Sequence, residues 1–225
     1  MSKVLIIVNA DVKSGQVSLN APVAQKMVTA LSKSINNTNS LTEIEIIGGA
    51  DLWTKSIQLP PSNDDLIYCP LTIKIPDWLE FPAKNIYRLC MDIKGRKDWV
   101  ETYFQYHTTM GDSFLGDLWL PIVLTGKGPI YGEVIGEGAI PNSYEQPIDF
   151  SDEIRQSLYY LGYQLLESIN AIPSVYLLQF RMLEQKIVFD RLWPFPAAPA
   201  IASINSQKPD LFACHCHCLL CQPIF

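Results

Sequence analysis

The sequence has no run of lysine or arginine and no long apolar stretch. Its 17 basic and 23 acidic residues give a formal net charge of −6 over 225 residues. Duplex nucleic acids and anionic membrane surfaces are bound through clustered positive charge, so neither partner is expected. No segment approaches the roughly 20 apolar residues that cross a bilayer, so no membrane span is expected either.

No targeting signal is expected at the start of the sequence. Only five strongly apolar residues, 4–8, follow Lys3, which is too few for the core of a signal peptide. We therefore expect a cytoplasmic protein with reduced cysteines and no disulfide framework. The hydrophobic share of 48% is enough for a folded core in a chain of this length.

Residues 1–110 are expected to form a βαβ-like half. The continuous apolar run at 4–8 predicts a buried strand. Apolar residues then recur every four positions from Val23 to Ile35, which predicts a helix whose N-cap is Asn20. Strand, helix and strand in this order favour a parallel pair joined by a right-handed crossover.

Four later segments of this half are assigned from their composition. Residues 43–47 and 66–69 have the apolar character of strands. Residues 86–91 fit either a strand or a helix, and a strand is expected. Aromatic residues within 97–107 favour a helix that buries a broad aromatic face.

Residues 111–225 are expected to form a second half of sheet and helix, unless the whole chain is one domain. Apolar runs at 119–124 and 130–135 flank a glycine-containing turn, which predicts a hairpin. Ser151 is placed to cap a helix that ends at Asn170. A second hairpin is expected at 175–192. The predicted fold class is α/β, with α+β as the alternative.

A cluster of soft metal ligands lies close to the C-terminal end of the chain. Four of the six cysteines and two of the three histidines fall within residues 214–221. Thiolate and imidazole are zinc ligands, and the candidate ligands are Cys214, His217, Cys218 and Cys221. The alternative is that the cysteines pack as small apolar side chains on a buried helix.

The glycine-rich turn Gly126–Lys127–Gly128 is a candidate phosphate-binding loop, because backbone N–H groups and a lysine can cradle phosphates. Strands are expected on both sides of it, whereas the known phosphate-loop patterns open a helix. A hairpin turn with a solvated lysine is the alternative. His107 and Asp112 are a further acid–base candidate, against a histidine that simply ends a helix.

Ionisable residues within the second hairpin must be paired or functional, since burying an unpaired charge costs several kcal/mol. Asp190 is the strongest candidate for a catalytic position, and Arg181 and Arg191 are the candidates beside it.

Residues 132–199 resemble the C-terminal lobe of ATP-grasp ligases in the order and spacing of their elements. In that family the last two strands carry an acidic residue and then a Glu-x-Asn-Pro-like motif, which hold the magnesium of ATP. Here Gln179 stands at the first acidic position, Asp190 at the glutamate and Leu192 at the asparagine. Two of the three ligand positions therefore depart from the pattern.

The resemblance implies nucleotide phosphates near Lys127 and a divalent ion near Asp190 and Glu184. A carboxylate would be activated as an acyl phosphate for attack by an amine. The last strand is also similar to that of the chorismate-lyase-like fold, in which an acidic residue precedes a proline as Asp190 precedes Pro194.

Three hypotheses on function follow. The leading one is a small-molecule enzyme, an ATP-dependent carboxylate–amine ligase, with its site between the two halves. The second is a non-catalytic accessory protein whose tail binds zinc or docks on a partner. The third is a degenerate enzyme-fold protein, which the residues at Gln179 and Leu192 favour.

Overall fold

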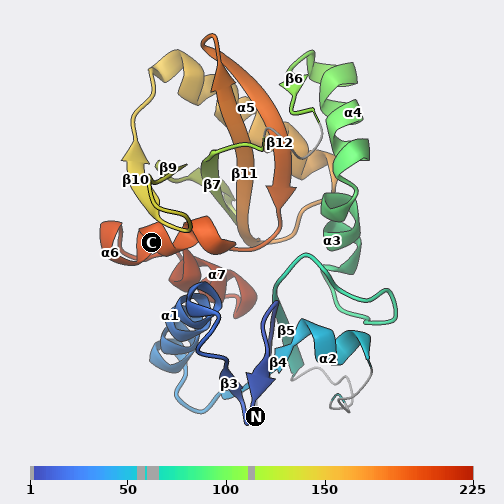
Figure 1. Ribbon diagram of the computed structural model, residues 1–225, viewed down its shortest axis with the longest axis vertical. Helices are drawn as coiled ribbons and strands as arrows, with labels where there is room; N and C mark the ends of the chain where they lie inside the picture. Colours follow the sequence, from blue (N-terminus) through green and yellow to red (C-terminus); the bar gives the residue numbers. More distant parts are fainter. Residues whose placement is uncertain (1–2, 55–58, 60–65, 111–114, 225) are drawn as a thin grey trace.

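Two stacked sheets with helices between and around them form the protein (Figure 1). The computed structural model describes residues 3–54, 59, 66–110 and 115–224. The predicted boundary near residue 110 stays a prediction, because Gly111 and Asp112 lie outside the described residues. The predicted α/β class is confirmed, with one parallel and one largely antiparallel sheet.

The smaller sheet is parallel and has β1 (Lys3–Val8) at its centre, between β4 (Glu43–Gly48) and β5 (Leu66–Leu71). The side chains from Val4 to Val8 are at most 1% exposed, which explains why the run is continuously apolar. The crossover between β1 and β4 is α1 (Pro22–Thr38). The three strands and the helix are confirmed, but the N-cap is Ala21, without a side-chain bond, and the prediction of Asn20 was wrong.

Short elements complete this half. They are β2 (Val12–Lys13), β3 (Gln16–Val17) and α2 (Gly49–Trp53).

Two consecutive helices, α3 (Lys84–Met91) and α4 (Ile93–Phe104), connect the sheets (Figure 1). The prediction of a strand at 86–91 was wrong. Ile86, Tyr87 and Cys90 are the buried residues of α3, and their spacing is that of one helix face. α4 begins where the Asp92 side chain accepts a hydrogen bond from the Gly95 N–H, at 3.0 Å.

The larger sheet has seven strands, in the order β10-β9-β7-β11-β12-β6, with β8 paired to β7. Both predicted hairpins are confirmed, although the apolar run at 130–135 is split between two strands. The strands are β6 (His107–Thr108), β7 (Leu118–Thr125), β8 (Gly128–Tyr131), β9 (Val134–Glu137), β10 (Tyr144–Ile148), β11 (Ser174–Leu183) and β12 (Lys186–Trp193).

Both faces of this sheet are covered, so alternate side chains of β11 enter different cores. Tyr176 and Leu178 pack with α5 (Asp152–Ser168), whereas Val175 and Leu177 pack with α7 (Leu211–Leu219). α5 begins at the predicted cap, Ser151.

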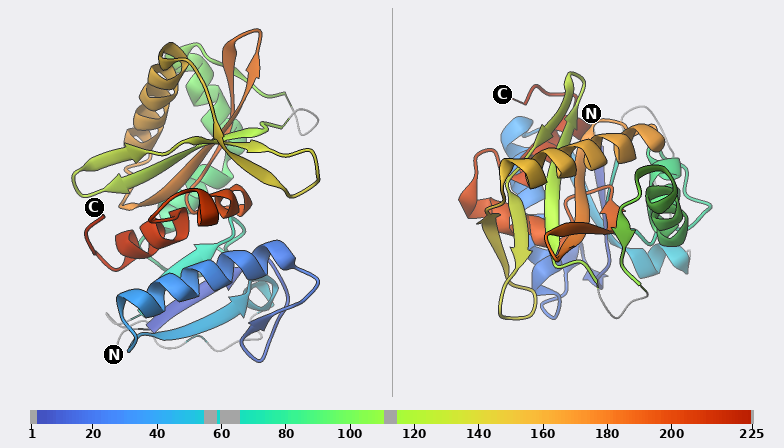
Figure 2. Two further views of the ribbon diagram at one scale, coloured as in Figure 1. Left: turned by 90° about the vertical axis from the view of Figure 1, so that its left-hand side faces the viewer. Right: turned by 90° about the horizontal axis from the view of Figure 1, so that it is seen from above.

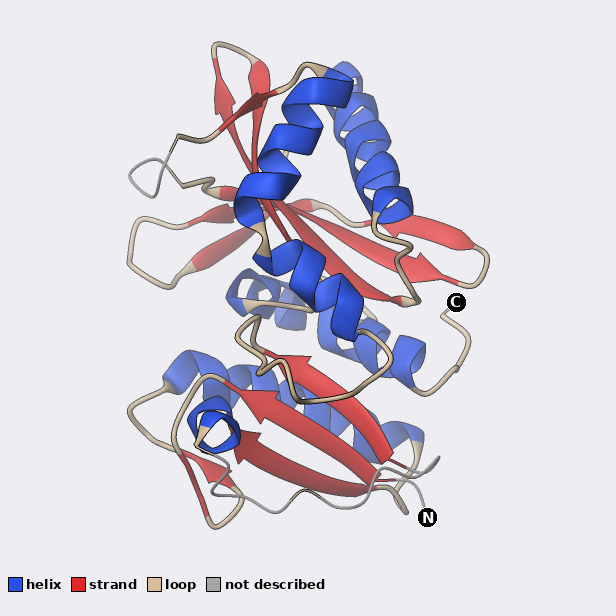
Figure 3. Cartoon of the chain, turned by 90° about the vertical axis from the view of Figure 1, so that its right-hand side faces the viewer, coloured by secondary structure: helices blue, strands red, loops and turns tan. Residues whose placement is uncertain are grey.

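The helix α7 lies between the sheet and α1 (Figure 2, left, and Figure 3). It follows η1 (Ala198–Ala202) and α6 (Ser203–Ser206) and is capped by Asp210, which accepts a hydrogen bond from the Ala213 N–H at 2.8 Å. The apolar core of the parallel sheet therefore continues through α7 into the larger sheet. Within the described ranges, no helix has the length and apolar character to cross a membrane.

Candidate functional site

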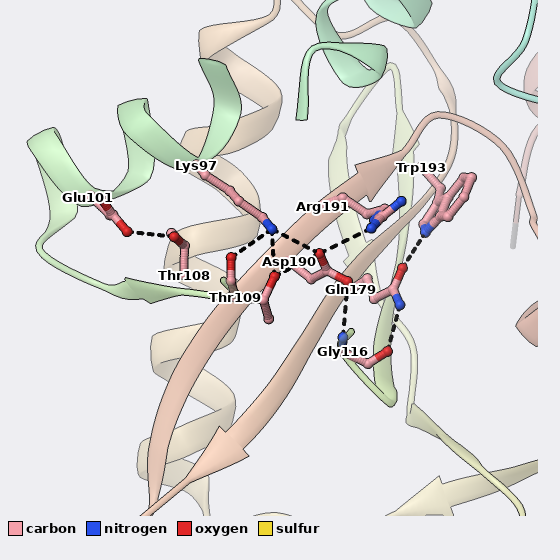
Figure 4. Close-up of polar contacts among 9 residues, drawn as sticks. All are labelled: Lys97, Glu101, Thr108, Thr109, Gly116, Gln179, Asp190, Arg191 and Trp193. Carbon is pink, nitrogen blue, oxygen red and sulfur yellow. Dashed lines mark hydrogen bonds and ion pairs between the residues drawn. The ribbon is translucent and has the colours of Figure 1, made fainter. Parts of the chain in front are cut away.

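A β-bulge in β12 sets the direction of the Asp190 side chain. Gln179 pairs with Arg191 and Phe180 pairs with Phe189, so Asp190 is the extra residue between two ladder positions. A bulge bends its strand and changes the direction in which side chains point. Here it turns the carboxylate of Asp190 toward α4 and the start of β7 (Figure 4).

The carboxylate of Asp190 is fully buried and surrounded by donors. The Thr109 hydroxyl donates to Oδ1 at 2.9 Å, and the Gly116 N–H donates to Oδ2 at 3.0 Å. Nζ of Lys97 and a guanidinium nitrogen of Arg191 each lie 3.4 Å from Oδ1. Two hydrogen-bond donors and two cations thus offset the unfavourable burial of this charge.

Thr109 also fixes the position of Lys97. The ammonium of Lys97 donates to the Thr109 carbonyl at 2.8 Å and to its Oγ1 at 2.6 Å (Figure 4). The Lys97 side chain is only 13% exposed. The ammonium is therefore held against Asp190 and does not move freely in solvent.

Gln179 is the second polar residue of this site, and both ends of its amide are occupied. Nε2 donates to the Gly116 carbonyl at 2.6 Å, and Oε1 accepts from Nε1 of Trp193 at 2.8 Å. The guanidinium of Arg191 lies 5.7 Å from the centre of the Trp193 ring, within cation–π distance. One connected polar network therefore joins β11, β12 and the start of β7.

These residues do not fit a magnesium ion. Magnesium is usually bound by carboxylates and water in octahedral geometry, but among the described residues Asp190 is the one carboxylate of this network, and its oxygens already accept from protein donors. Gln179 supplies a neutral amide whose oxygen is engaged by Trp193. In the described part of the chain no group of three or more His, Cys, Asp or Glu residues is placed to hold a metal.

Two other candidates on the hairpin lie beyond the bulge, toward the hairpin turn. Arg181 pairs with Val188, beyond the bulge. Glu184 lies in the hairpin turn with φ of 49°, six positions before Asp190, which corresponds to about 20 Å of extended chain. The structure therefore does not place Glu184 beside Asp190, where the resemblance implied a divalent ion.

The candidate phosphate loop lies at the other end of β7 from Asp190. Gly126, Lys127 and Gly128 form the turn between β7 and β8, whereas Gly116 precedes β7. The eight residues of β7 span about 25 Å, so Lys127 and Asp190 do not face one bound nucleotide phosphate chain. The turn is the hairpin that the alternative interpretation predicted.

The turn instead meets the C-terminal tail. Lys127, His217, Cys218 and Cys221 line one cavity of about 450 Å³. The Cys218 thiol donates to the Leu124 carbonyl at 3.5 Å, and Nδ1 of His217 donates to the Pro223 carbonyl at 3.0 Å.

The predicted metal ligands of the tail are not gathered into a metal site. Cys214 and Cys218 are buried, and Cys221 is exposed. Burial raises the pKa of Cys214 to about 11 and of Cys218 to about 12, which disfavours the thiolate that zinc needs. Cys214, Cys216 and Cys218 pack as small apolar side chains of α7, as the alternative interpretation predicted, whereas Cys221 lies beyond the end of the helix.

A cavity of about 590 Å³ lies between the two sheets. Val8 and Leu71, at the carboxyl ends of β1 and β5, form one wall, and Gln179 and Trp193 of the polar network form the opposite wall. Ligands of open α/β sheets bind at the carboxyl ends of parallel strands, and this volume is in the range of small-molecule sites. The sequence analysis expected a site between the two halves but placed it at Lys127 and Asp190, which do not line this cavity. The carboxyl end of β1 was a usable signal for its position.

Comparison with solved structures identifies the fold. The chain is similar to N5-carboxyaminoimidazole ribonucleotide synthetase from Thermotoga maritima, with 11% identity, a TM-score of 0.66 and coverage of 100% of this chain and 77% of the other. It is also similar to N5-carboxyaminoimidazole synthase from Aspergillus clavatus in complex with ADP and 5-aminoimidazole ribonucleotide, with 10% identity, a TM-score of 0.67 and coverage of 100% and 78%.

A third similar structure is that of a putative ATP-grasp superfamily protein from Archaeoglobus fulgidus, with 9% identity, a TM-score of 0.59 and coverage of 100% and 89%. The sequence itself matches no protein-family model and no curated protein. At these identities the likeness concerns the fold alone. The protein has an ATP-grasp-like fold, and the resemblance found in residues 132–199 is confirmed at that level.

Proposed function

We propose that the protein binds a small molecule in the cavity between its sheets and is a degenerate member of the ATP-grasp-like fold, without a magnesium-dependent step. The observation that carries this proposal is the contact between Lys97 and Asp190. The ammonium of Lys97 lies 3.4 Å from Oδ1 of Asp190, the carboxylate at which the resemblance to ATP-grasp ligases implied a divalent ion. The cavity supports the binding of a small molecule, and the network around Asp190 supports the absence of a magnesium-dependent step.

The polar network supports a binding role because it shapes one wall of the cavity. Gln179 and Trp193 line the cavity and are held to each other by a hydrogen bond of 2.8 Å. The Gly116 backbone and Arg191 hold these two residues from the side of Asp190. A wall whose side chains are fixed in advance loses little conformational entropy when a ligand binds.

The second candidate function is the ATP-dependent carboxylate–amine ligase. It is favoured by the structural likeness to a synthase whose structure was determined with ADP and 5-aminoimidazole ribonucleotide. Because one carboxylate of the usual set is an amide and the other is paired with Lys97, we derive no phosphoryl-transfer step through magnesium. A ligase would consume ATP in the presence of magnesium, whereas a degenerate binding protein would not.

Thermal shift with a small-molecule library tests the proposed binding role. We expect stabilising compounds whose effect is lost in Ala24→Trp, because Ala24 lines the cavity and an indole at this position fills it. The matched control is Lys26→Trp, which adds the same side chain at an exposed position of α1. Compounds that stabilise both variants as strongly as the wild type would show that binding occurs elsewhere.

A further inference from the structure

The walls of the cavity between the sheets indicate the class of its ligand, an inference that rests on the proposed binding function. Aromatic side chains from the larger sheet and the segment after it dominate one side, namely Trp119, Tyr144, Trp193 and Phe195. Trp119 and Tyr144 meet edge to face at 5.6 Å, and so do Trp193 and Phe195 at 5.9 Å. Such walls favour a flat aromatic ring, which gains from stacked or edge-to-face contacts.

The opposite side of the cavity is aliphatic. Val8, Met27 and Leu71 belong to β1, α1 and β5 and lie across from the aromatic wall. A ring between these walls would lose most of its contact with water, and each buried apolar group adds to the binding free energy. Apolar side chains make up most of both walls, although Gln179 and Asn142 also line the cavity, and this composition disfavours a sugar or another strongly hydrated ligand.

The charge of the cavity is small and positive. Among the described residues that line it, Lys74 is the only charged one and none is an aspartate or glutamate, in a chain with a formal net charge of −6. Lys74 is exposed, and no residue of the described ranges forms an ion pair with it. One lysine balances one negative charge, so the cavity suits a monoanion better than a cation or a nucleotide polyphosphate.

The start of α1 also favours a negatively charged ligand. Val23 and Ala24 line the cavity within the first turn of a helix of 17 residues, and the cap residue Ala21 provides no side-chain acceptor. Backbone N–H groups of a first helical turn have no partner within the helix and favour a nearby negative charge.

We propose that the cavity binds an aromatic monoanion, such as an aryl or indolyl carboxylate. The ring lies between Trp119, Trp193 and the aliphatic wall, and the carboxylate is directed to Lys74. Nothing in this inference requires ATP or magnesium.

Isothermal titration calorimetry with three indole compounds tests the ligand class. Indole-3-acetate, indole and tryptamine share one ring and carry a negative, no and a positive charge. We expect indole-3-acetate to bind at least tenfold more tightly than tryptamine, with indole between them. Equal or tighter binding of tryptamine would overturn the proposal.

Two lysine variants test whether the carboxylate of the ligand binds at Lys74. Lys74→Gln should weaken indole-3-acetate about fivefold, as expected for a partly exposed ion pair, and leave indole unchanged. Lys26→Gln, at an exposed position on α1 outside the cavity lining, should change neither affinity. An unchanged affinity of Lys74→Gln for indole-3-acetate would contradict the assignment of the carboxylate.

Substitutions that fill the cavity test whether the indole ring of the ligand binds there. Ala24→Trp and Ala198→Phe each place a large side chain in the lining, so two separate variants guard against a folding defect in one of them. Both should abolish binding of indole-3-acetate at unchanged Tm. Binding of ADP in the cavity without binding of indole-3-acetate would overturn the ligand class but leave the binding function, whereas the absence of any stabilising compound would remove both.

Discussion

Nζ of Lys97 lies 3.4 Å from Oδ1 of Asp190, beside a carboxylate whose side chain is 0% exposed. The resemblance to ATP-grasp ligases implied a divalent ion at this carboxylate, but the structure places a lysine and an arginine there. Two side-chain cations thus act as the counter-charge of Asp190. Two hydrogen-bond donors complete its surroundings, and this arrangement is the basis of the proposed function without magnesium.

Removing the lysine should destabilise the fold. Lys97→Met leaves Arg191 as the one cation that the described residues place beside the buried carboxylate, and breaking a buried pair in this way costs about 3 kcal/mol. Urea unfolding measures the free energy of unfolding. The matched control Lys94→Met changes an exposed lysine of the same helix and should stay within about 0.5 kcal/mol of the wild type.

A double variant tests whether the loss of stability comes from the Lys97–Asp190 ion pair. Lys97→Met combined with Asp190→Leu replaces both charges by apolar groups, so much of the lost stability should return. Losses that simply add in the double variant would show that the two side chains do not stabilise each other.

Acid should destabilise the protein through His215. Burial lowers the pKa of His215 to about 3 from its usual value of 6.5, because the charged imidazolium loses its hydration. The folded state therefore prefers the neutral ring, so the stabilisation is complete above pH 6.5 and falls as the pH decreases from 6.5 toward 3. Between pH 7 and pH 5 the expected loss from this group is about 2 kcal/mol.

The comparison variant is His215→Gln, whose unfolding free energy should fall less between pH 7 and pH 5. Identical slopes for the wild type and His215→Gln would contradict the buried, neutral state of His215.

Thiol labelling should distinguish one cysteine from the other five. Cys221 is exposed, whereas the remaining five cysteines are buried. Burial also raises the pKa of Cys214 and Cys218 to about 11 and about 12, so these thiols remain protonated and slow to react at pH 8. We expect one rapidly labelled thiol per native chain by mass spectrometry, lost in Cys221→Ser. Any rapidly labelled thiol that remains in Cys221→Ser would contradict the burial of the other five cysteines.

The turn between β11 and β12 offers a stabilising substitution. Glu184 and Gln185 have φ of 49° and 63°, a left-handed backbone that strains residues with a side chain. Gln185→Gly should raise the free energy of unfolding by up to about 1 kcal/mol, since two-residue hairpin turns favour glycine. The exposed neighbour Lys186→Gly serves as the control and should destabilise, because glycine weakens a strand.

Much of the fold could be predicted because its signals are local. The continuous apolar run from Val4 to Val8, the four-residue period of α1 and the cap at Ser151 each follow from a few neighbouring residues. The segment 86–91 was misassigned because six residues without a glycine or proline boundary fit both periods, and only its packing on Val100 and Leu120 in one core decides for a helix.

The site depends on contacts between distant parts of the chain. The sequence identified Asp190 and the substitution at Gln179, but nothing near them indicated that Lys97 of α4 would reach the carboxylate. Lys127 was assigned to the same site because its glycine-rich neighbours resemble a phosphate loop. The length of β7 places it at the opposite end of the sheet, and that length was readable from the apolar run at 119–124.

The central claim is that this ATP-grasp-like fold binds ligands without magnesium. Isothermal titration of the wild-type protein with ATP, with and without magnesium chloride, tests it most directly. Because Lys97 and Arg191 already neutralise Asp190, we predict that magnesium leaves the ATP affinity, whether weak or undetectable, unchanged within twofold. If magnesium raised the ATP affinity tenfold or more, and this effect disappeared in Asp190→Asn, the result would contradict the account and support the ligase function.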